Sequence, residues 1–83
     1  MSARFLNEFT SLILDTKDRN ELVDFFKGIL TPKELEEIPV RLQIIKMLKA
    51  GVPQHEIARK LGVGIATVTR GSKEVQKGKF KNV

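Results

Sequence analysis

Apolar residues recur at helical spacing along most of the chain. The first stripe follows the order i, i+1, i+4, i+7, i+8 and consists of Phe5, Leu6, Phe9, Leu12 and Ile13. A polar break at residues 15–20 separates it from a second stripe of the same kind, made of Leu22, Val23, Phe26, Ile29 and Leu30. Each stripe is typical of one face of an amphipathic helix. Asp18 is placed to cap the second helix.

A strong helix start follows at Thr31-Pro32-Lys33-Glu34. Thr31 can cap the helix, the proline tolerates the first turn, and Glu34 can reach back to the cap. The third stripe runs through Leu35, Ile38, Leu42, Ile45 and Leu48. Pro39 lies inside it and should kink or split the helix, because it removes one backbone hydrogen bond. Gly51 is expected to end this helix, and Pro53 to open the next.

Residues 54–70 have the pattern of two short helices joined by a tight turn. A shared apolar core is expected from Ile57, Leu61 and Val68. Gly62 stands at the turn, where the chain needs a positive φ. The second helix should begin near Ile65 with small and hydroxyl residues, a start that fits deep in the major groove of DNA. The pattern favours a helix-turn-helix over an ordinary helical hairpin.

Composition excludes several classes of function. The 83 residues include no cysteine and a single histidine, His55. A disulfide scaffold, a thiolate zinc site, a cysteine nucleophile and a multi-histidine metal site are therefore excluded. No pair of carboxylates lies in a plausible cleft, so we expect neither an enzyme nor a bound metal. No apolar run approaches the roughly 20 residues of a membrane span, and no signal peptide is evident. We expect a cytoplasmic protein without membrane contact.

Charge is distributed unevenly along the chain. Residues 1–40 carry five basic and eight acidic side chains, a net charge of −3, whereas residues 41–83 carry ten basic and two acidic ones, a net charge of +8. The two parts account for the overall charge of +5. Such asymmetry is typical of a polyanion-binding half joined to a half with another role. A solvated basic surface is the alternative interpretation.

The string Gly64-Ile65-Ala66-Thr67-Val68-Thr69-Arg70-Gly71-Ser72 strongly resembles the recognition helix of the tryptophan repressor family. The helix start Leu30-Thr31-Pro32, followed ten residues later by Arg41, resembles the same family, and the similarity covers roughly residues 28–77. It implies an all-α, intertwined homodimer that binds double-stranded operator DNA, with L-tryptophan as the corepressor. A transcriptional repressor gated by tryptophan or a similar small ligand is therefore the expected function. A helical protein-interaction module without DNA binding is the alternative.

The expected DNA contacts come from both helices of the motif. They are Gln54, His55, Ile65, Ala66, Thr67, Thr69 and Lys73. Gln54 and the first helix N-terminus would hold phosphates. Ile65, Ala66 and Thr69 would face base edges. His55 stands near the place of a base-reading arginine in the family; the alternative is an exposed histidine that touches nothing.

The resemblance also implies a ligand pocket. Its expected residues are Gly28, Leu30, Thr31, Arg41, Thr67, Arg70, Gly71 and Glu74. The indole would lie between the two arginines, with its carboxylate on Arg70 and on Thr31 or Thr67. Backbone carbonyls near Gly28 and Leu30 of the other subunit would receive the ammonium. Arginine suits these roles because its planar guanidinium stacks on rings and also forks onto carboxylates.

Two glycines of this set lie within predicted helices, where glycine is costly unless something packs close. Gly28 therefore suggests a close backbone approach, and Gly71 suggests room for the ring. Glu74 stands where the family has a serine near the ammonium. Arg41 as a plain surface arginine and Arg70 as a phosphate contact are the alternatives.

We expect one domain over residues 1–83. Within it, residues 1–30 would form a dimerisation region, residues 31–77 the ligand-pocket helix and helix-turn-helix, and residues 78–83 a frayed basic tail. The dimer is expected because two strongly apolar helices carry more hydrophobic surface than one short chain covers.

Overall fold

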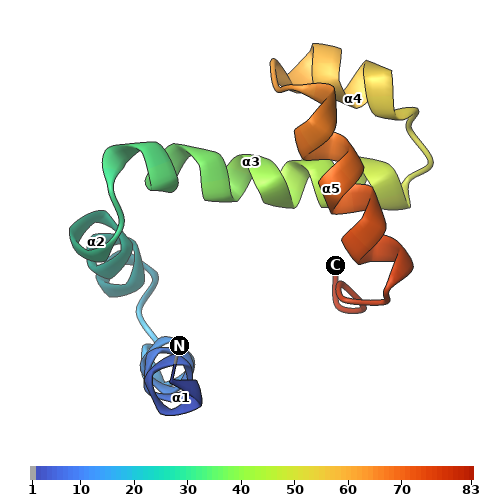
Figure 1. Cartoon of the computed structure of the whole chain (residues 1–83). Coiled ribbons are helices and arrows are strands. Elements are labelled where there is room, and N and C mark those ends of the chain that lie inside the picture. Colours follow the sequence, from blue (N-terminus) through green and yellow to red (C-terminus); the bar gives the residue numbers. More distant parts are fainter. Residues whose placement is uncertain (1) are drawn as a thin grey trace. The chain divides into compact units, whose positions relative to one another are not determined.

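The computed structural model describes residues 2–83 and contains five helices (Figure 1). They are α1 (Ala3–Asp15), α2 (Arg19–Ile29), α3 (Pro32–Lys49), α4 (Gln54–Leu61) and α5 (Ile65–Gln76). No strand occurs within residues 2–83, so the predicted all-α class is confirmed. None of the helices in this range is long and apolar enough to cross a membrane.

The helices fall into two compact units. One comprises the chain up to Leu35, and the other comprises Glu36–Val83. The division therefore lies within α3, shortly after its capped start. The expectation of a single domain over residues 1–83 stays a prediction.

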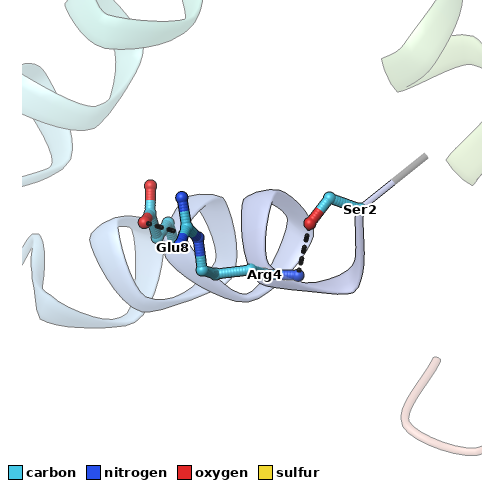
Figure 2. Close-up of polar contacts among 3 residues, drawn as sticks. All are labelled: Ser2, Arg4 and Glu8. Carbon is cyan, nitrogen blue, oxygen red and sulfur yellow. Dashed lines mark hydrogen bonds and ion pairs between the residues drawn. The ribbon is translucent and has the colours of Figure 1, made fainter.

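In the first unit, side-chain caps start both helices. The Ser2 hydroxyl accepts a hydrogen bond of 3.2 Å from the backbone N–H of Arg4, and the Arg4 guanidinium pairs with Glu8 at 4.0 Å one turn on (Figure 2). Asp18 caps α2 by accepting a bond of 3.3 Å from the N–H of Asn20, as predicted. These bonds satisfy donors that a helix start leaves without an internal partner.

The apolar faces of α1 and α2 remain largely uncovered. Phe9 and Phe25 pack with ring centroids 6.0 Å apart, but neither helix contains a buried residue. Phe5 is 61% exposed and Leu14 is 76% exposed. The predicted stripes are therefore present as helices, and most of their hydrophobic surface is open for burial against another molecule.

The predicted capping box at the start of α3 is confirmed. The N–H of Glu34 donates to the Thr31 hydroxyl at 3.1 Å, and the N–H of Thr31 donates to a Glu34 carboxylate oxygen at 2.8 Å. Of the two outcomes predicted at Pro39, a kink or a split, the split does not occur, because α3 continues through the proline to Lys49. Pro39 is exposed, so the ring needs no space in the core and water can solvate the carbonyl that lacks its usual donor.

Three fully buried side chains form the core of the second unit, one from each helix: Ile44, Ile57 and Val68. The partly buried apolar residues packed on them are Val40, Met47, Leu48, Val52, Ala58, Leu61 and Val63. This matches the shared core predicted for residues 54–70. Helices α4 and α5 pack directly on each other (Figure 1).

Glycines make the two turns of this unit. Gly62 ends α4 with φ 66°, and the next N–H, that of Val63, returns to the carbonyl of Ala58 at 3.1 Å. Gly51 follows α3 with φ 84°. Both conformations lie in the left-handed region that suits glycine, as the sequence predicted. Pro53 stands at the N-cap position of α4, one residue earlier than a first-turn position.

Residues 78–83, for which a frayed basic tail was predicted, lie against the end of α3. The segment forms consecutive turns, and the Lys49 ammonium donates to the backbone carbonyls of Phe80 and Val83, each at 2.6 Å. These bonds join the end of α3 to residues more than thirty positions later. Such a contact between distant parts of the chain leaves no signal in local composition, which is why the segment resembled a solvated tail.

The capping box predicts a pH dependence of stability. Hydrogen bonds from the Thr31 N–H, and secondly from its side chain, hold the pKa of the Glu34 carboxyl below its usual range. The carboxylate therefore stabilises the folded chain fully above the ordinary carboxyl range, and this contribution is lost as the pH falls through the lowered pKa. The stability difference between wild type and Glu34→Gln should be larger at about pH 7 than at about pH 3 in urea unfolding followed by circular dichroism.

Glu36→Gln provides the matched control, because Glu36 is exposed on the same helix and makes no hydrogen bond to Thr31. Its stability difference should vary less with pH. A constant difference for Glu34→Gln across this pH range would contradict the role given to the carboxylate.

Candidate functional site

Helix α5 presents different residues on its two flanks. Val68 is fully buried and defines the side that faces the core. Ala66, Thr69 and Lys73 follow each other at spacings of three and four residues, so they share one flank. Thr67, Arg70 and Glu74 have the same spacing one position later and share a second flank, about 100° round the helix from the first.

The second flank lines a cavity of about 420 Å³, a volume in the usual range of small-molecule sites. Its walls come from α3, α5 and the segment after α5. The lining residues are Ile38, Arg41, Leu42, Ile44, Ile45, Thr67, Arg70, Gly71, Glu74 and Phe80. The structure thus brings together five of the predicted ligand residues, namely Arg41, Thr67, Arg70, Gly71 and Glu74.

The charged groups of the cavity differ in their partners. Arg41 lies 4.0 Å from Glu37, and Glu74 lies 3.4 Å from the Lys77 ammonium. Arg70 makes no hydrogen bond or ion pair with any residue from 2 to 83, and its side chain is exposed. The cavity therefore offers one uncommitted guanidinium for an anion, and a carboxylate within the same lining for a cation.

Gly71 is in close contact with α3. A Cβ atom at this position would lie 3.3 Å from Ile44 Cγ2, 3.3 Å from Ile45 Cδ1 and 3.5 Å from Leu48 Cδ1. The close packing expected at this glycine is present, and the atoms that require it belong to α3. At Gly28, in contrast, a Cβ would meet no atom within 4 Å, so the suggested close approach is absent from residues 2–83.

Three predicted ligand residues do not line the cavity: Gly28, Leu30 and Thr31. All three belong to the unit that ends at Leu35. The Thr31 hydroxyl is engaged in the cap of α3. The resemblance assigned Gly28 and Leu30 to a second subunit, and their role stays a prediction.

The predicted DNA residues lie on α4 and α5. The Thr69 hydroxyl donates to Gln54 Oε1 at 2.8 Å, which ties the start of α4 to the first turns of α5. Ile65 is 50% exposed, and Ala66, Thr67 and Lys73 are exposed as well. His55 is exposed and makes no hydrogen bond within residues 2–83. The arrangement leaves these side chains accessible to a large ligand.

The basic side chains of the second unit fall into two groups. Lys60 pairs with Glu56 at 3.2 Å, and Lys77 and Lys49 are engaged as described above. Exposed cations that pair with nothing in residues 2–83 are Lys46, Arg59, Arg70, Lys73, Lys79 and Lys81. With ten basic and four acidic residues, the unit carries a net charge of +6. Within residues 2–83 no cluster of side chains is placed to hold a metal ion.

Sequence reasoning missed part of the cavity wall. Ile38, Leu42 and Ile44 belong to the predicted apolar stripe or its edge, but only the helix crossing shows that they face a cavity. Phe80 was assigned to the basic tail. A large aromatic residue within such a tail was the one signal that the segment packs on something.

Comparison with known proteins places the chain in a family. The family model described as Trp repressor protein matches residues 4–82, so the chain belongs to the Trp repressor family. The resemblance found in the sequence is thereby confirmed. No solved structure matches the chain significantly.

Individual relatives agree with this assignment. A Trp operon repressor homolog of Vibrio campbellii is 36% identical over 70 residues, which cover 83% of this chain and 70% of that protein. A Trp operon repressor homolog of Vibrio cholerae is 43% identical over 49 residues, or 58% of this chain and 48% of that protein. The uncharacterized protein YerC of Bacillus subtilis is 32% identical over 65 residues, or 78% and 62%.

The bond between Thr69 and Gln54 predicts energetic coupling between α4 and α5. A neutral hydrogen bond contributes about 0.5–1.5 kcal/mol. A double-mutant cycle of Thr69→Val and Gln54→Ala, measured by urea unfolding, should give a coupling energy in that range. Thr67→Val is the control, because exposed Thr67 makes no bond to Gln54, and it should show no coupling. Equal coupling for the two threonines would contradict the bond.

Proposed function

We propose that the chain is a dimeric, sequence-specific DNA-binding transcriptional repressor whose affinity for DNA is set by a small molecule in the cavity between α3 and α5. One observation carries the proposal: α5 has one flank with exposed Ala66, partly exposed Thr69 and exposed Lys73, and a second flank, about 100° round the helix, that lines the cavity. A ligand on one flank therefore acts on the helix that reads DNA with the other.

The ends of the two motif helices support contact with phosphates. Neither Pro53, before α4, nor Gly64, before α5, supplies a side-chain cap. The free N–H groups of a helix start attract anions, and the positive charge of the unit acts in the same direction. With the N-termini of α4 and α5 held against the DNA phosphates, α5 would enter the major groove as the recognition helix of a helix-turn-helix.

A second copy of the chain would supply the two-fold symmetry that such repressors use. The uncovered faces of α1 and α2 provide hydrophobic surface for this association. A dimer would place two recognition helices about 34 Å apart, one turn of DNA. Cytoplasmic location follows from a DNA target and belongs to the same proposal.

The ligand we propose is L-tryptophan or a molecule of similar chemistry. The free guanidinium of Arg70 suits a carboxylate, Glu74 suits an ammonium, and the apolar lining suits an aromatic body. Two of the relatives carry the name Trp operon repressor homolog, which supports tryptophan among the aromatic amino acids. Backbone carbonyls near Gly28 and Leu30 of a second copy of the chain would receive the ammonium, and Thr31 or Thr67 would hold the carboxylate with Arg70.

DNA binding is tested by the salt dependence of affinity for a duplex selected from random sequences. Lys73→Ala should weaken binding to specific and non-specific duplexes alike and reduce the slope of log affinity against log salt by about one. Thr69→Ala should weaken specific binding more than non-specific binding, because a base contact carries sequence information.

Lys17→Ala, which removes an exposed lysine of the other unit, should leave both affinities unchanged. Equal losses on both duplexes for Thr69→Ala would argue against base reading. Absence of any DNA binding at low salt would favour the alternative function, a helical module that binds another protein through the open faces of α1 and α2.

Ligand binding is tested through the fluorescence of tryptophan itself, since the chain contains no tryptophan or tyrosine. Arg70→Ala should weaken binding at least about tenfold, because loss of a charge-assisted hydrogen bond costs about 1.5–3 kcal/mol. Arg59→Ala removes a cation that does not line the cavity and should leave binding unchanged. An emission spectrum unaltered by saturating wild-type protein would contradict tryptophan as the ligand.

A further inference from the structure

We infer that Phe80 is a specificity-determining residue of the cavity, and that Lys49 is the positioning residue that holds it there. The inference rests on the proposed ligand site and adds a wall that the predicted pocket lacks. On this view the segment after α5 is part of the ligand site and selects a flat, aromatic acid over an aliphatic acid of similar size.

After α5 the chain reverses direction and returns to the cavity. Gly78 adopts φ 80°, its N–H bonds to the carbonyl of Val75 at 2.9 Å, and the N–H of Lys79 bonds to the carbonyl of Glu74 at 3.3 Å. A left-handed glycine with such returning bonds is a common way to end a helix and reverse its direction. Phe80 follows two residues later, is partly buried, and lines the cavity.

Lys49 fixes this segment to α3. Its ammonium donates to the carbonyls of Phe80 and Val83 at 2.6 Å each, so two of its three donors are used on the same short stretch. Lys49 is the last residue of α3, the helix that also carries Arg41 and Ile45. The segment after α5 is therefore bonded to α3, which forms one wall of the cavity, and it follows directly from α5, which forms the other.

The ring adds to the preference for an aromatic ligand that the stacking guanidinium groups of Arg41 and Arg70 would give. Aromatic rings favour tilted or offset contact with other rings over contact with aliphatic groups of equal area. Among the lining residues that the structure describes, Phe80 is the one aromatic residue, and Arg41 and Arg70 belong to the same lining. A ligand whose carboxylate binds Arg70 would share the cavity with this ring.

The test compares L-tryptophan, followed by its fluorescence, with L-leucine as a competitor, in full-length variants. Phe80→Leu keeps apolar volume and removes the ring, so it should weaken tryptophan binding roughly five- to tenfold and leucine binding much less. Lys49→Met should weaken tryptophan binding in the same direction by releasing the segment. Asn82→Ala, an exposed position of that segment, should bind both amino acids as wild type does.

A second readout needs no ligand. In the free protein, the NMR methyl resonances of the cavity residues Ile38, Leu42 and Ile45 should shift in Phe80→Leu, because these methyls would lose the ring current of the phenyl group. The methyl resonances of Ile57 and Val68 serve as the control and should show that the core is intact. Unshifted cavity methyls would overturn the inference, as would a Phe80→Leu variant that weakens both amino acids equally. Wild-type protein that binds neither amino acid would overturn the proposed ligand, and this inference with it, whatever the methyls show.

Discussion

The contact of α5 with α3 at Gly71 is the constraint on which the rest of the site depends. A Cβ atom at this position would press on Ile44 and Ile45, which would have to give by a few tenths of an ångström, and it would be in ordinary contact with Leu48. Ile44 and Ile45 are themselves buried, so they have little freedom to move away. The close approach of the two helices at this level therefore depends on the absence of a Cβ atom.

A fixed crossing also decides what each flank of α5 presents. Val68 faces the core, and this single orientation places Thr69 toward Gln54 and Thr67 toward the cavity. Thr67 and Thr69 are two positions apart, so at about 100° per residue their side chains point about 160° apart round the helix and differ in surroundings. The residues that we propose for DNA and those that we propose for a small ligand are thus interleaved in the sequence of one short helix.

Local interactions explain how far the fold could be predicted from the sequence. The caps at Asp18 and Thr31 and the glycine turn at Gly62 act within four or five residues, so their signals lie in short strings. The bonds from Lys49 to Phe80 and Val83 span more than thirty residues and leave no such signal. The choice between a kink and a split at Pro39 stayed open in the sequence for a related reason, since only the folded helix shows that this proline faces water.

The same contrast between local and distant contacts explains which residues of the candidate site could be predicted. The family resemblance placed Arg41, Arg70, Gly71 and Glu74 in one pocket, and these four residues line the cavity. Phe80 could not be placed, because its position depends on a chain reversal and a distant lysine. Gly28 and Leu30 were assigned to the ligand site of a second subunit, and the structure of one chain does not test that assignment. The sequence was therefore informative wherever neighbours in the chain are also neighbours in space.

Pro39 gives α3 an uneven stiffness. The helix lacks one hydrogen bond at the turn where the carbonyl of Leu35 would have received the missing N–H, and the boundary between the two compact units follows that residue. Bending is least costly at such a turn, because no bond has to break there. The missing bond thus coincides with the division of the chain into its two units, whereas the turns of α3 that carry Ile44 and Ile45 keep all of their backbone donors.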